Sequence, residues 1–395
     1  MNIRTIKKPQ RRVDVSYVTR FNMQSYGFDN LYPQDCAKVA AASGTADLCI
    51  ARYARFIEGY GFEDAAVADL AVNRQGTTAD ELLHLLAADL ARFGGFAVHV
   101  NYNALCEVAD IHFVPFEQCR LEEPDDTGHV AHILLHPDWE QKTTRGGKRL
   151  LVSEQTVGRF NVFNPSPEVV AQEIANVGGV DKYNGQILWV SKDGAFVYPR
   201  TIYDSALTDL STDEGLGNIK YRNVRNNFLI SCMLVTRKGE MHYAEDNAQD
   251  KDDRLISDDD LRAFQGDERA LKILGVEIDK EEDKPEVVPF PTKNYDKEFS
   301  VTDASVVERI YAQFGQELFY AIRIGKLGFS GKVMQDAYEY YAGTVTTEQR
   351  IIQRALENII AHWHNEPLKG RSCIIQPLKY ISADSADNNS IKNEQ

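Results

Sequence analysis

The chain has 395 residues, of which 43% are hydrophobic, and a formal net charge of −15. This length allows one large domain or two to three modest ones, and the absence of any run of about 18 apolar residues argues against a membrane-spanning helix. Six cysteines without a CxxC pair, and a basic, polar amino terminus without an apolar stretch, argue against a disulfide scaffold, a zinc knuckle and a secretory signal. The acidic balance also argues against tight binding of nucleic acid through phosphates.

The first half of the chain combines helical and strand-like patterns. Residues 1–30 are polar and predict an extended arm, and residues 33–60 predict a helix interrupted at Ser43-Gly44. Thr78-Ala-Asp-Glu81 has the sequence of a capping box and predicts the start of the next helix. Strands are predicted at residues 96–102, 109–116, 130–135, 149–153 and 187–190. Together these patterns predict an α+β domain that ends near residue 200.

The second half begins with two helical patterns on either side of an acidic segment. Residues 200–229 and 302–324 have apolar residues at helical spacing. Between them, residues 244–286 contain more than twice as many acidic as basic residues. We interpret this segment as a solvated surface module, and the alternatives are a contact surface for a basic partner or a rim that repels DNA. Strand fragments are predicted at 230–236, 276–278 and 287–290, and a short capped helix is predicted to begin at Ser257.

A glycine-rich segment follows the second of these helices. It contains Gly325, Gly328 and Gly331 and continues into a long amphipathic helical pattern. We expect a mobile loop carried by a rigid helix, because glycine permits backbone conformations that other residues avoid. Gly343 and the capping-box sequence Thr346-Thr-Glu-Gln349 predict that the long helix bends or restarts there.

The chain contains no motif that specifies catalysis or a bound metal. The glycine-rich segment ends in Gly331-Lys332-Val333, which lacks the hydroxyl that a Walker loop uses to bind magnesium. His129, His132 and His136 lie in a strand-like stretch without a Cys or carboxylate partner nearby, so a zinc site is not expected. We therefore assign no catalytic residue, no cofactor and no metal ligand, and the absence of such motifs disfavours an enzyme without excluding one.

In this order, the segments resemble the portal proteins of tailed bacteriophages and prophages. Tyr26-Gly-Phe-Asp-Asn-Leu-Tyr-Pro33 and the helix end at Ile57-Glu-Gly-Tyr-Gly-Phe62 are similar to the start of portal sequences. Phe93-Gly-Gly-Phe-Ala-Val-His-Val100 and Ile111-His-Phe-Val-Pro-Phe116 resemble strands of the portal wing. The order of helix, acidic module, helix, glycine loop and long helix resembles the portal order of stem, clip, stem, tunnel loop and wing helix. The resemblance covers residues 20–365.

The resemblance implies an α+β, portal-like fold with a defined set of parts. These parts are an amino-terminal arm and wing (1–200), a first stem helix (201–230), an acidic clip-like α/β module (231–297), a second stem helix (298–324), a tunnel loop (325–333), a long kinked wing helix (334–366) and a polar tail that replaces the usual crown (367–395).

The resemblance also implies a function. Twelve copies of the chain would form a ring at one capsid vertex, and double-stranded DNA would pass through its channel during packaging and ejection. The implied partners are further copies of the chain, the large terminase subunit, a head–tail adaptor and the major capsid or scaffolding protein, without a membrane. The ring would be assembled in the host bacterial cytoplasm and would belong to the virion.

Two groups of site residues follow from the resemblance. The tunnel-loop candidates are Gly325, Lys326, Gly328, Gly331 and Lys332. The two lysines would make weak, transient contacts with DNA phosphates. The candidates for contact between the clip and the terminase or adaptor are Asp258, Asp259, Asp260, Glu281 and Glu282.

Two other readings of the sequence remain open. One is a different head–tail connector protein such as an adaptor, although adaptors are much shorter and lack two long helices around an acidic module. The other is a metal-dependent nucleotidyl or phosphoryl transferase that uses paired carboxylates of the acidic segment, although none of these pairs lies on a convincing strand-and-loop scaffold.

Overall fold

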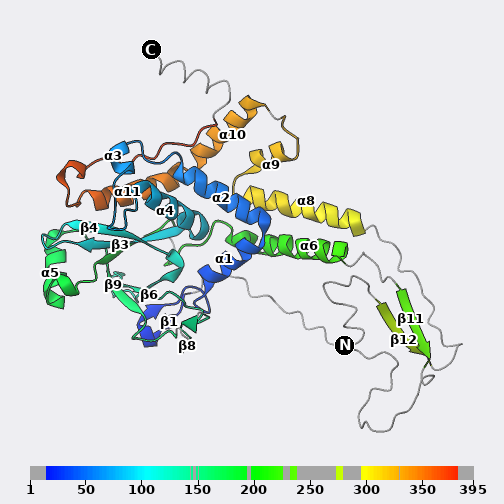
Figure 1. The fold of residues 1–395 in the computed structure, drawn as a ribbon, viewed down its shortest axis with the longest axis horizontal. Helices are drawn as coiled ribbons and strands as arrows, with labels where there is room; N and C mark the ends of the chain where they lie inside the picture. Colours follow the sequence, from blue (N-terminus) through cyan, green and yellow to red (C-terminus); the bar gives the residue numbers. More distant parts are fainter. Residues whose placement is uncertain are drawn as a thin grey trace, which may run out of the picture. The chain divides into compact units, whose positions relative to one another are not determined.

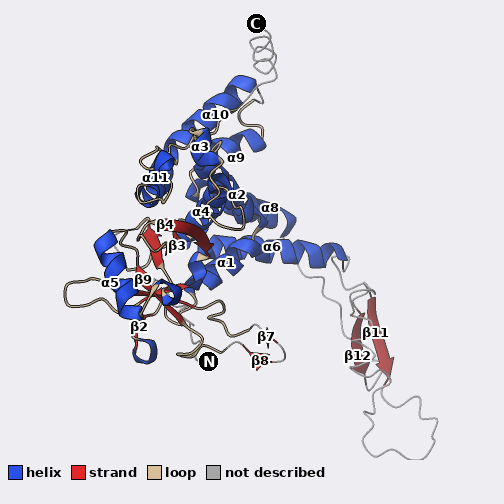
Figure 2. Ribbon diagram, turned by 60° about the vertical axis from the view of Figure 1, so that its left-hand side comes forward, coloured by secondary structure: helices blue, strands red, loops and turns tan. Residues whose placement is uncertain are grey.

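The structure of the chain is a computed structural model. It describes residues 15–142, 144–145, 148–149, 151–193, 197–225, 232–237, 273–278, 295–328 and 330–380. The chain divides into a compact unit formed by Met1–Ser211 and Val307–Gln395, and an inserted unit formed by Thr212–Val306. Figure 1 shows the course of the chain, and Figure 2 shows the helices and strands by type. None of the described helices has both the length and the apolar character that crossing a membrane requires.

The compact unit contains a six-stranded sheet covered by helices, which agrees with the predicted α+β class. Its helices are α1 (Tyr32–Ala42), α2 (Gly44–Glu58), α3 (Ala65–Ala68), α4 (Ala79–Phe93), α5 (Pro167–Val177), α9 (Glu317–Arg323), α10 (Gly331–Thr344) and α11 (Thr346–Ile360). The strands of the main sheet are β3 (Gly95–Tyr102), β4 (Val108–Val114), β5 (Cys119–Leu121), β6 (His132–Leu135), β9 (Gly158–Val162) and β10 (Gln186–Ser191). Two small pairs of strands accompany it, β1 (Tyr17–Val18) with β2 (Met23–Gln24) and β7 (Thr144–Arg145) with β8 (Lys148–Arg149).

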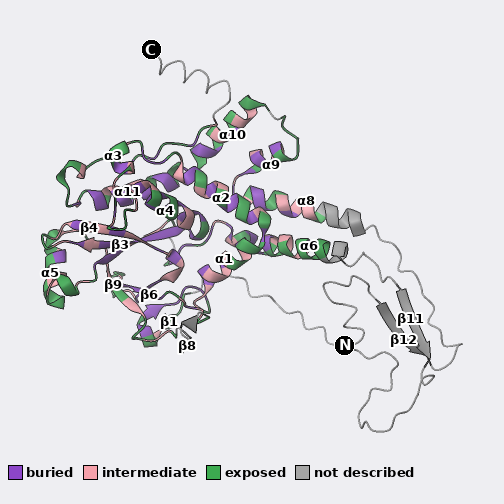
Figure 3. Cartoon of the chain, in the orientation of Figure 1, coloured by how far each residue is buried: buried purple, intermediate pink, exposed green. Residues whose placement is uncertain are grey.

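The main sheet has the strand order β4-β3-β10-β9-β6-β5. Its neighbouring strands are antiparallel except for β9 and β10, which are parallel. Most of β3 is buried, as Figure 3 shows, because α4 packs on it and other strands flank it on both sides. Figures 1 and 2 show α4 next to β3 and β4, with α2, α10 and α11 further from the sheet.

Local capping explains where the first long helices begin. The Ser43 side chain accepts a hydrogen bond from the Ala46 N–H (3.1 Å), so the chain ends α1 and starts α2 at the predicted interruption. At the start of α4, the Thr78 hydroxyl accepts a hydrogen bond from the Glu81 N–H (3.2 Å), and the Glu81 carboxylate accepts one from the Thr78 N–H (2.9 Å). This is the predicted capping box, which satisfies N–H groups that have no partner within the helix.

Several predicted elements are wrong in their extent. Of the predicted strand over residues 149–153, only Arg149 lies in a strand (β8), and residues 151–153 are not in one, whereas β9 and α5 were not predicted at all. The segment 302–324 is not one helix, because α8 (Tyr295–Gln313) ends before Gly315, whose φ of +63° is left-handed, and α9 begins after it. The predicted restart near residue 345 is confirmed as the break between α10 and α11, but Thr346 does not cap α11: its hydroxyl donates to the Gly343 carbonyl (3.1 Å) instead.

The beginning of the predicted polar tail is part of the compact unit. Cys373, Ile375 and Leu378 are buried. The backbone of Gln376 pairs with the turn after α2: its carbonyl accepts from the Tyr60 N–H, and its N–H donates to the Gly61 carbonyl, both at 2.9 Å. A Cβ at Gly59 would lie 2.0 Å from the Gln376 carbonyl oxygen, so this turn requires glycine. The tail residues 381–395 lie outside the described part of the chain.

Two helices lead out to the inserted unit and back. They are α6 (Leu207–Arg225), which begins later than predicted, and α8. Within the compact unit, Arg309 pairs with Asp209 (3.3 Å), and within the inserted unit Lys220 pairs with Asp303 (2.7 Å). The two helices are therefore held side by side in each part.

The described strands of the inserted unit are β11 (Cys232–Arg237) and β12 (Ile273–Ile278), as two of the predicted fragments indicated. They are parallel and in register from Cys232 opposite Ile273 to Arg237 opposite Ile278. Parallel strands need a long crossover connection, which fits the length of sequence between them. The helix predicted at Ser257 and the strand predicted at 287–290 lie outside the described residues.

Candidate functional site

The candidate site is the connection between α9 and α10, residues 324–330, which we call the α9–α10 loop. All of its described residues are exposed. Figure 1 shows it joining the amino-terminal end of α10, away from α11. Of the tunnel-loop candidates, Gly325, Lys326 and Gly328 lie in this loop. Gly331 and Lys332 were expected in the loop as well, but they form the first turn of α10.

Both ends of the α9–α10 loop are fixed by hydrogen bonds. At its start, the N–H groups of Lys326 and Leu327 donate to the Ala321 carbonyl (2.9 and 3.2 Å), which closes the carboxyl end of α9. At its end, the Ser330 hydroxyl accepts from the Val333 N–H (3.3 Å) and caps α10. A serine directly before a helical pattern is a capping signal that the sequence analysis overlooked.

The glycines of this region differ in what the backbone requires of them. Gly325 has a φ of +77°, a left-handed conformation in which a side chain causes strain. Gly328 and Gly331 have no left-handed φ, and a Cβ at either position would meet open space. Gly325 is therefore needed for the turn, whereas the other two are not required by local geometry.

A buried amide connects the base of the loop to the rest of the compact unit. Gln316 lies at the break between α8 and α9, and its Nε2 donates to the Cys49 carbonyl and to the Tyr341 hydroxyl, both at 2.9 Å. Its Oε1 accepts from Arg52 Nη1 (3.0 Å). The Tyr341 hydroxyl donates in turn to the Phe314 carbonyl (3.0 Å). This network joins α2, the α8–α9 break and α10.

Aromatic packing surrounds the same connection. The ring of Phe319, on α9, lies 5.9 Å from Phe56 on α2 and 5.6 to 5.8 Å from Tyr341 and Tyr338 on α10. The Arg52 guanidinium lies 4.6 Å from the Phe319 ring centre, within the range of a cation–π contact. The short helix α9 is therefore packed against two longer helices, and the exposed loop extends from a rigid base.

A second buried polar contact fixes the start of α11. Glu348 is buried, accepts a hydrogen bond from the Tyr53 hydroxyl (2.7 Å) and pairs with Lys192, whose Nζ also donates to Tyr53 (3.2 Å). Burial, reinforced by the Glu348 charge, raises the pKa of Tyr53, which keeps the phenol protonated as a donor. The Gln349 side chain donates to the Phe56 carbonyl (3.1 Å). These contacts join α11 to α2 and to the end of β10.

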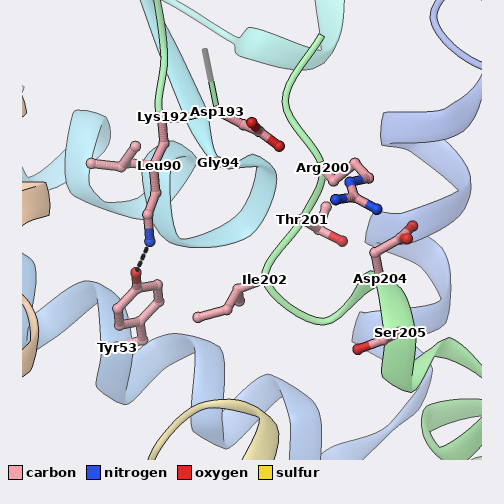
Figure 4. A pocket seen from close by; sticks show the side chains of 10 residues that line it. All are labelled: Tyr53, Leu90, Gly94, Lys192, Asp193, Arg200, Thr201, Ile202, Asp204 and Ser205. Carbon is pink, nitrogen blue, oxygen red and sulfur yellow. Dashed lines mark hydrogen bonds between the residues drawn. The ribbon is translucent and has the colours of Figure 1, made fainter. Parts of the chain in front are cut away.

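A cavity of about 430 Å³ lies beside Lys192 and Tyr53. Figure 4 shows Lys192 directed towards Tyr53, and Asp193, Arg200 and Asp204 are among the other residues that line the cavity. Because Lys192 is already paired with Glu348, its ammonium group serves the packing of α11. Among the described residues, no group of three His, Cys, Asp or Glu side chains is arranged to hold a metal ion.

The clip candidates Asp258, Asp259, Asp260, Glu281 and Glu282 lie outside the described residues. The structure therefore brings together only the loop candidates. Sequence reasoning missed Gln316, Ser330 and Glu348, of which only the Ser330 cap had a local sequence signal.

No protein-family model and no curated protein sequence matches the chain. Similar solved structures include the neck of an empty gene transfer agent (GTA) particle computed with C6 symmetry, with a TM-score of 0.49 and 11% sequence identity, covering 92% of this chain and 87% of that chain. The virion of a native GTA particle gives a TM-score of 0.47 at 12% identity, with 92% and 87% of the two chains covered. The neck of a native GTA particle computed with C12 symmetry gives 0.47 at 11% identity, with 92% and 89% covered. These values describe similar chain traces and assign neither a family nor an activity.

The first prediction concerns Gln316. Replacing it with Met removes the amide and leaves the Cys49 carbonyl and Arg52 without this partner, so we expect the free energy of unfolding to fall by about 2 to 3 kcal/mol. The matched control is Gln335→Met on the exposed face of α10, which should change stability by less than about 0.5 kcal/mol. Denaturant unfolding measures both values, and equal effects would contradict the role of Gln316.

The second prediction separates the glycines. Gly325→Ala forces a side chain into a left-handed conformation and should lower the free energy of unfolding by about 1 to 2 kcal/mol. Gly331→Ala, in the open first turn of α10, should be neutral or stabilising by up to about 0.5 kcal/mol, because alanine restricts the unfolded chain. The same unfolding experiment measures both variants, and a larger loss for Gly331→Ala would show that the assignment is wrong.

Proposed function

We propose that the chain is a portal-type subunit whose copies form a ring through which double-stranded DNA passes into and out of a phage-like capsid. The observation that carries this proposal is the way the inserted unit is connected. Helix α6 leads out of the compact unit and α8 leads back, and the chain then enters the exposed α9–α10 loop and the broken helix α10–α11. A portal subunit needs these parts in this order: stem, clip, stem, tunnel loop and wing helix.

In this proposal, each segment has a mechanical role. Residues 1–200 form the arm and wing, and α6 and the returning helix within 298–324 form the stem around the acidic clip, residues 231–297. The α9–α10 loop faces the channel, and its rigid base at Gln316 holds it there against the force of moving DNA. The clip, through Asp258, Asp259, Asp260, Glu281 and Glu282, contacts the terminase or a head–tail adaptor.

The charge of the chain suits DNA passage better than DNA binding. A protein that neutralises many phosphates gains affinity from the release of counterions, which would hold DNA in the channel. The net charge of −15 opposes such retention. Lys326 is exposed in the loop and Lys332 lies in the first turn of α10, and these two lysines provide only brief phosphate contacts. The ring itself would perform no chemistry, and a separate terminase would supply the work of packaging.

The proposed setting follows from this role. A ring of twelve subunits would occupy one capsid vertex, contact the major capsid or scaffolding protein, and be assembled in the bacterial cytoplasm before it becomes part of the virion.

Native mass spectrometry and negative-stain imaging of the full-length chain test the ring. We expect a closed assembly of many copies, near twelve, with a central opening. If rings form but do not support packaging in a reconstituted prohead and terminase system, the chain is a head–tail connector other than a portal. A monomer or dimer with metal-dependent phosphoryl or nucleotidyl transfer would contradict the proposal.

The role of the loop is tested by replacing residues 325–332 with a short rigid linker. We expect ring assembly to be retained, because the Gln316 network lies outside the replaced residues, and DNA packaging to be blocked. The control is the Gly331→Ala variant, which should assemble and package normally. Normal packaging by a ring with the replaced loop would contradict the assignment of the tunnel loop.

A further inference from the structure

One surface loop of the compact unit presents an aromatic side chain to solvent. This loop comprises residues 25–31, and we call it the Phe28 loop. Phe28 is 90% exposed, the largest exposed fraction among the large exposed hydrophobic residues of the described chain, and Asp29 beside it is also exposed. Exposure of one apolar side chain is ordinary, and what distinguishes this loop is how its backbone is held.

The Phe28 loop is held from below by a buried arginine. Arg120 is fully buried, and its Nε and Nη2 donate to the side-chain and backbone oxygens of Asn30, both at 2.6 Å. Its Nη1 donates to the carbonyls of Glu117 (2.9 Å) and Cys119 (2.7 Å). Burial lowers the pKa of Arg120 to about 10, so the group is still a cation at neutral pH. A buried cation that donates to this loop fixes its backbone strongly.

The loop backbone is also restrained from within. Asn30 has a φ of +64°, and its side chain accepts a hydrogen bond from the Tyr26 N–H (2.9 Å). Gly27 has a φ of +88°, and a Cβ there would lie 2.7 Å from the Tyr32 Cβ. The Tyr26 ring stacks on Tyr198 at 4.1 Å. The loop is thus ordered before any partner binds, which reduces the entropy that binding must overcome.

A groove of about 490 Å³ lies elsewhere on the compact unit, between α2 and α4. Its lining is mainly apolar, with Ile50, Ala51, Ala54 and Ala88, and the exposed residues Arg55 and Arg92 also line it. Asp47 also lines it, and Glu58 is paired there with His84 (2.9 Å). Because Phe28 is 90% exposed, it does not fill this groove in its own chain.

We propose that Phe28 of one copy inserts into the α2–α4 groove of a second copy, with Asp29 facing Arg55 and Arg92. The apolar ring matches the apolar part of the lining, and the Asp29 carboxylate can pair with the guanidinium of Arg55 or Arg92; of the two carboxylates in the lining, Glu58 is already paired with His84. Because the projection and the groove are different surfaces of one chain, the contact is heterologous, and repetition of such a contact closes a ring or extends a filament. The contact itself does not depend on the proposed function. Only the closure of repeated contacts into a ring rests on it.

Truncating Phe28 tests the contact in the full-length chain. Phe28→Ala should weaken self-association by on the order of 10- to 100-fold, as expected for an aromatic anchor in a pocket. The matched control is Leu105→Ala, which truncates a side chain that is 77% exposed on the β3–β4 hairpin and should leave association unchanged. Sedimentation velocity over a range of concentrations measures association, and thermal unfolding checks that both variants fold.

A mixing experiment tests whether the contact is heterologous. Ala88→Arg places a long charged side chain in the groove but keeps Phe28, whereas Phe28→Ala keeps the groove. At concentrations at which the wild type associates and the weakened variants do not, each variant alone should be monomeric, and their mixture should stop at one-to-one heterodimers, because only one productive contact can form. The proposal would be overturned if either variant assembled like the wild type, or if Phe28→Ala and Leu105→Ala weakened association equally. It would also be overturned if the mixture formed no heterodimers or if the wild type did not associate. If wild-type chains form filaments that depend on Phe28, the contact stands and the proposed ring fails.

Discussion

The buried amide of Gln316 is the interaction on which the arrangement around the α9–α10 loop depends. An unpaired amide in the interior costs free energy, and this one is paired with three groups: the Cys49 carbonyl, Arg52 and the Tyr341 hydroxyl. These partners lie on α2 and α10, so the position of α9 is set by elements that precede and follow it in the chain. The exposed loop therefore begins from a fixed point although its own residues make few contacts.

The same physical design occurs at the Phe28 loop, with a different group. There a buried cation, Arg120, has its hydrogen bonds satisfied largely by carbonyl oxygens of the loop and its surroundings. Both loops present exposed residues, and both are held by buried polar groups that would be costly to leave unpaired. In the proposed ring, loops held in this way would keep their place when a neighbouring subunit or the DNA pushes against them.

The sequence predicted what local chemistry determines. The Thr78 capping box and the Ser43 interruption depend on neighbouring residues only, and both are confirmed. The α8–α9 break was missed because the apolar spacing continues through Gly315. The hydrogen bonds that keep the Gln316 side chain buried are made with residues distant in sequence, so no local pattern indicates them. Strand β9 was missed because it is short and mostly half-buried, and its parallel pairing with β10 is a long-range choice that single residues do not reveal. The candidate loop was located correctly, but its last two candidates belong to α10, for which the Ser330 cap was the available signal.

In the proposed assembly, copies of this chain form a ring and the α9–α10 loop faces its axis. The most direct measurement is negative-stain imaging of the full-length chain with a gold particle attached to a cysteine introduced at Gly328, in a background where Cys106 and Cys232 are replaced by Ser. Gly328 is exposed and a side chain there meets open space, so the label should not disturb the fold. We expect closed rings with gold density at the central opening. Rings with gold at the outer edge, or assemblies without an opening, would contradict it.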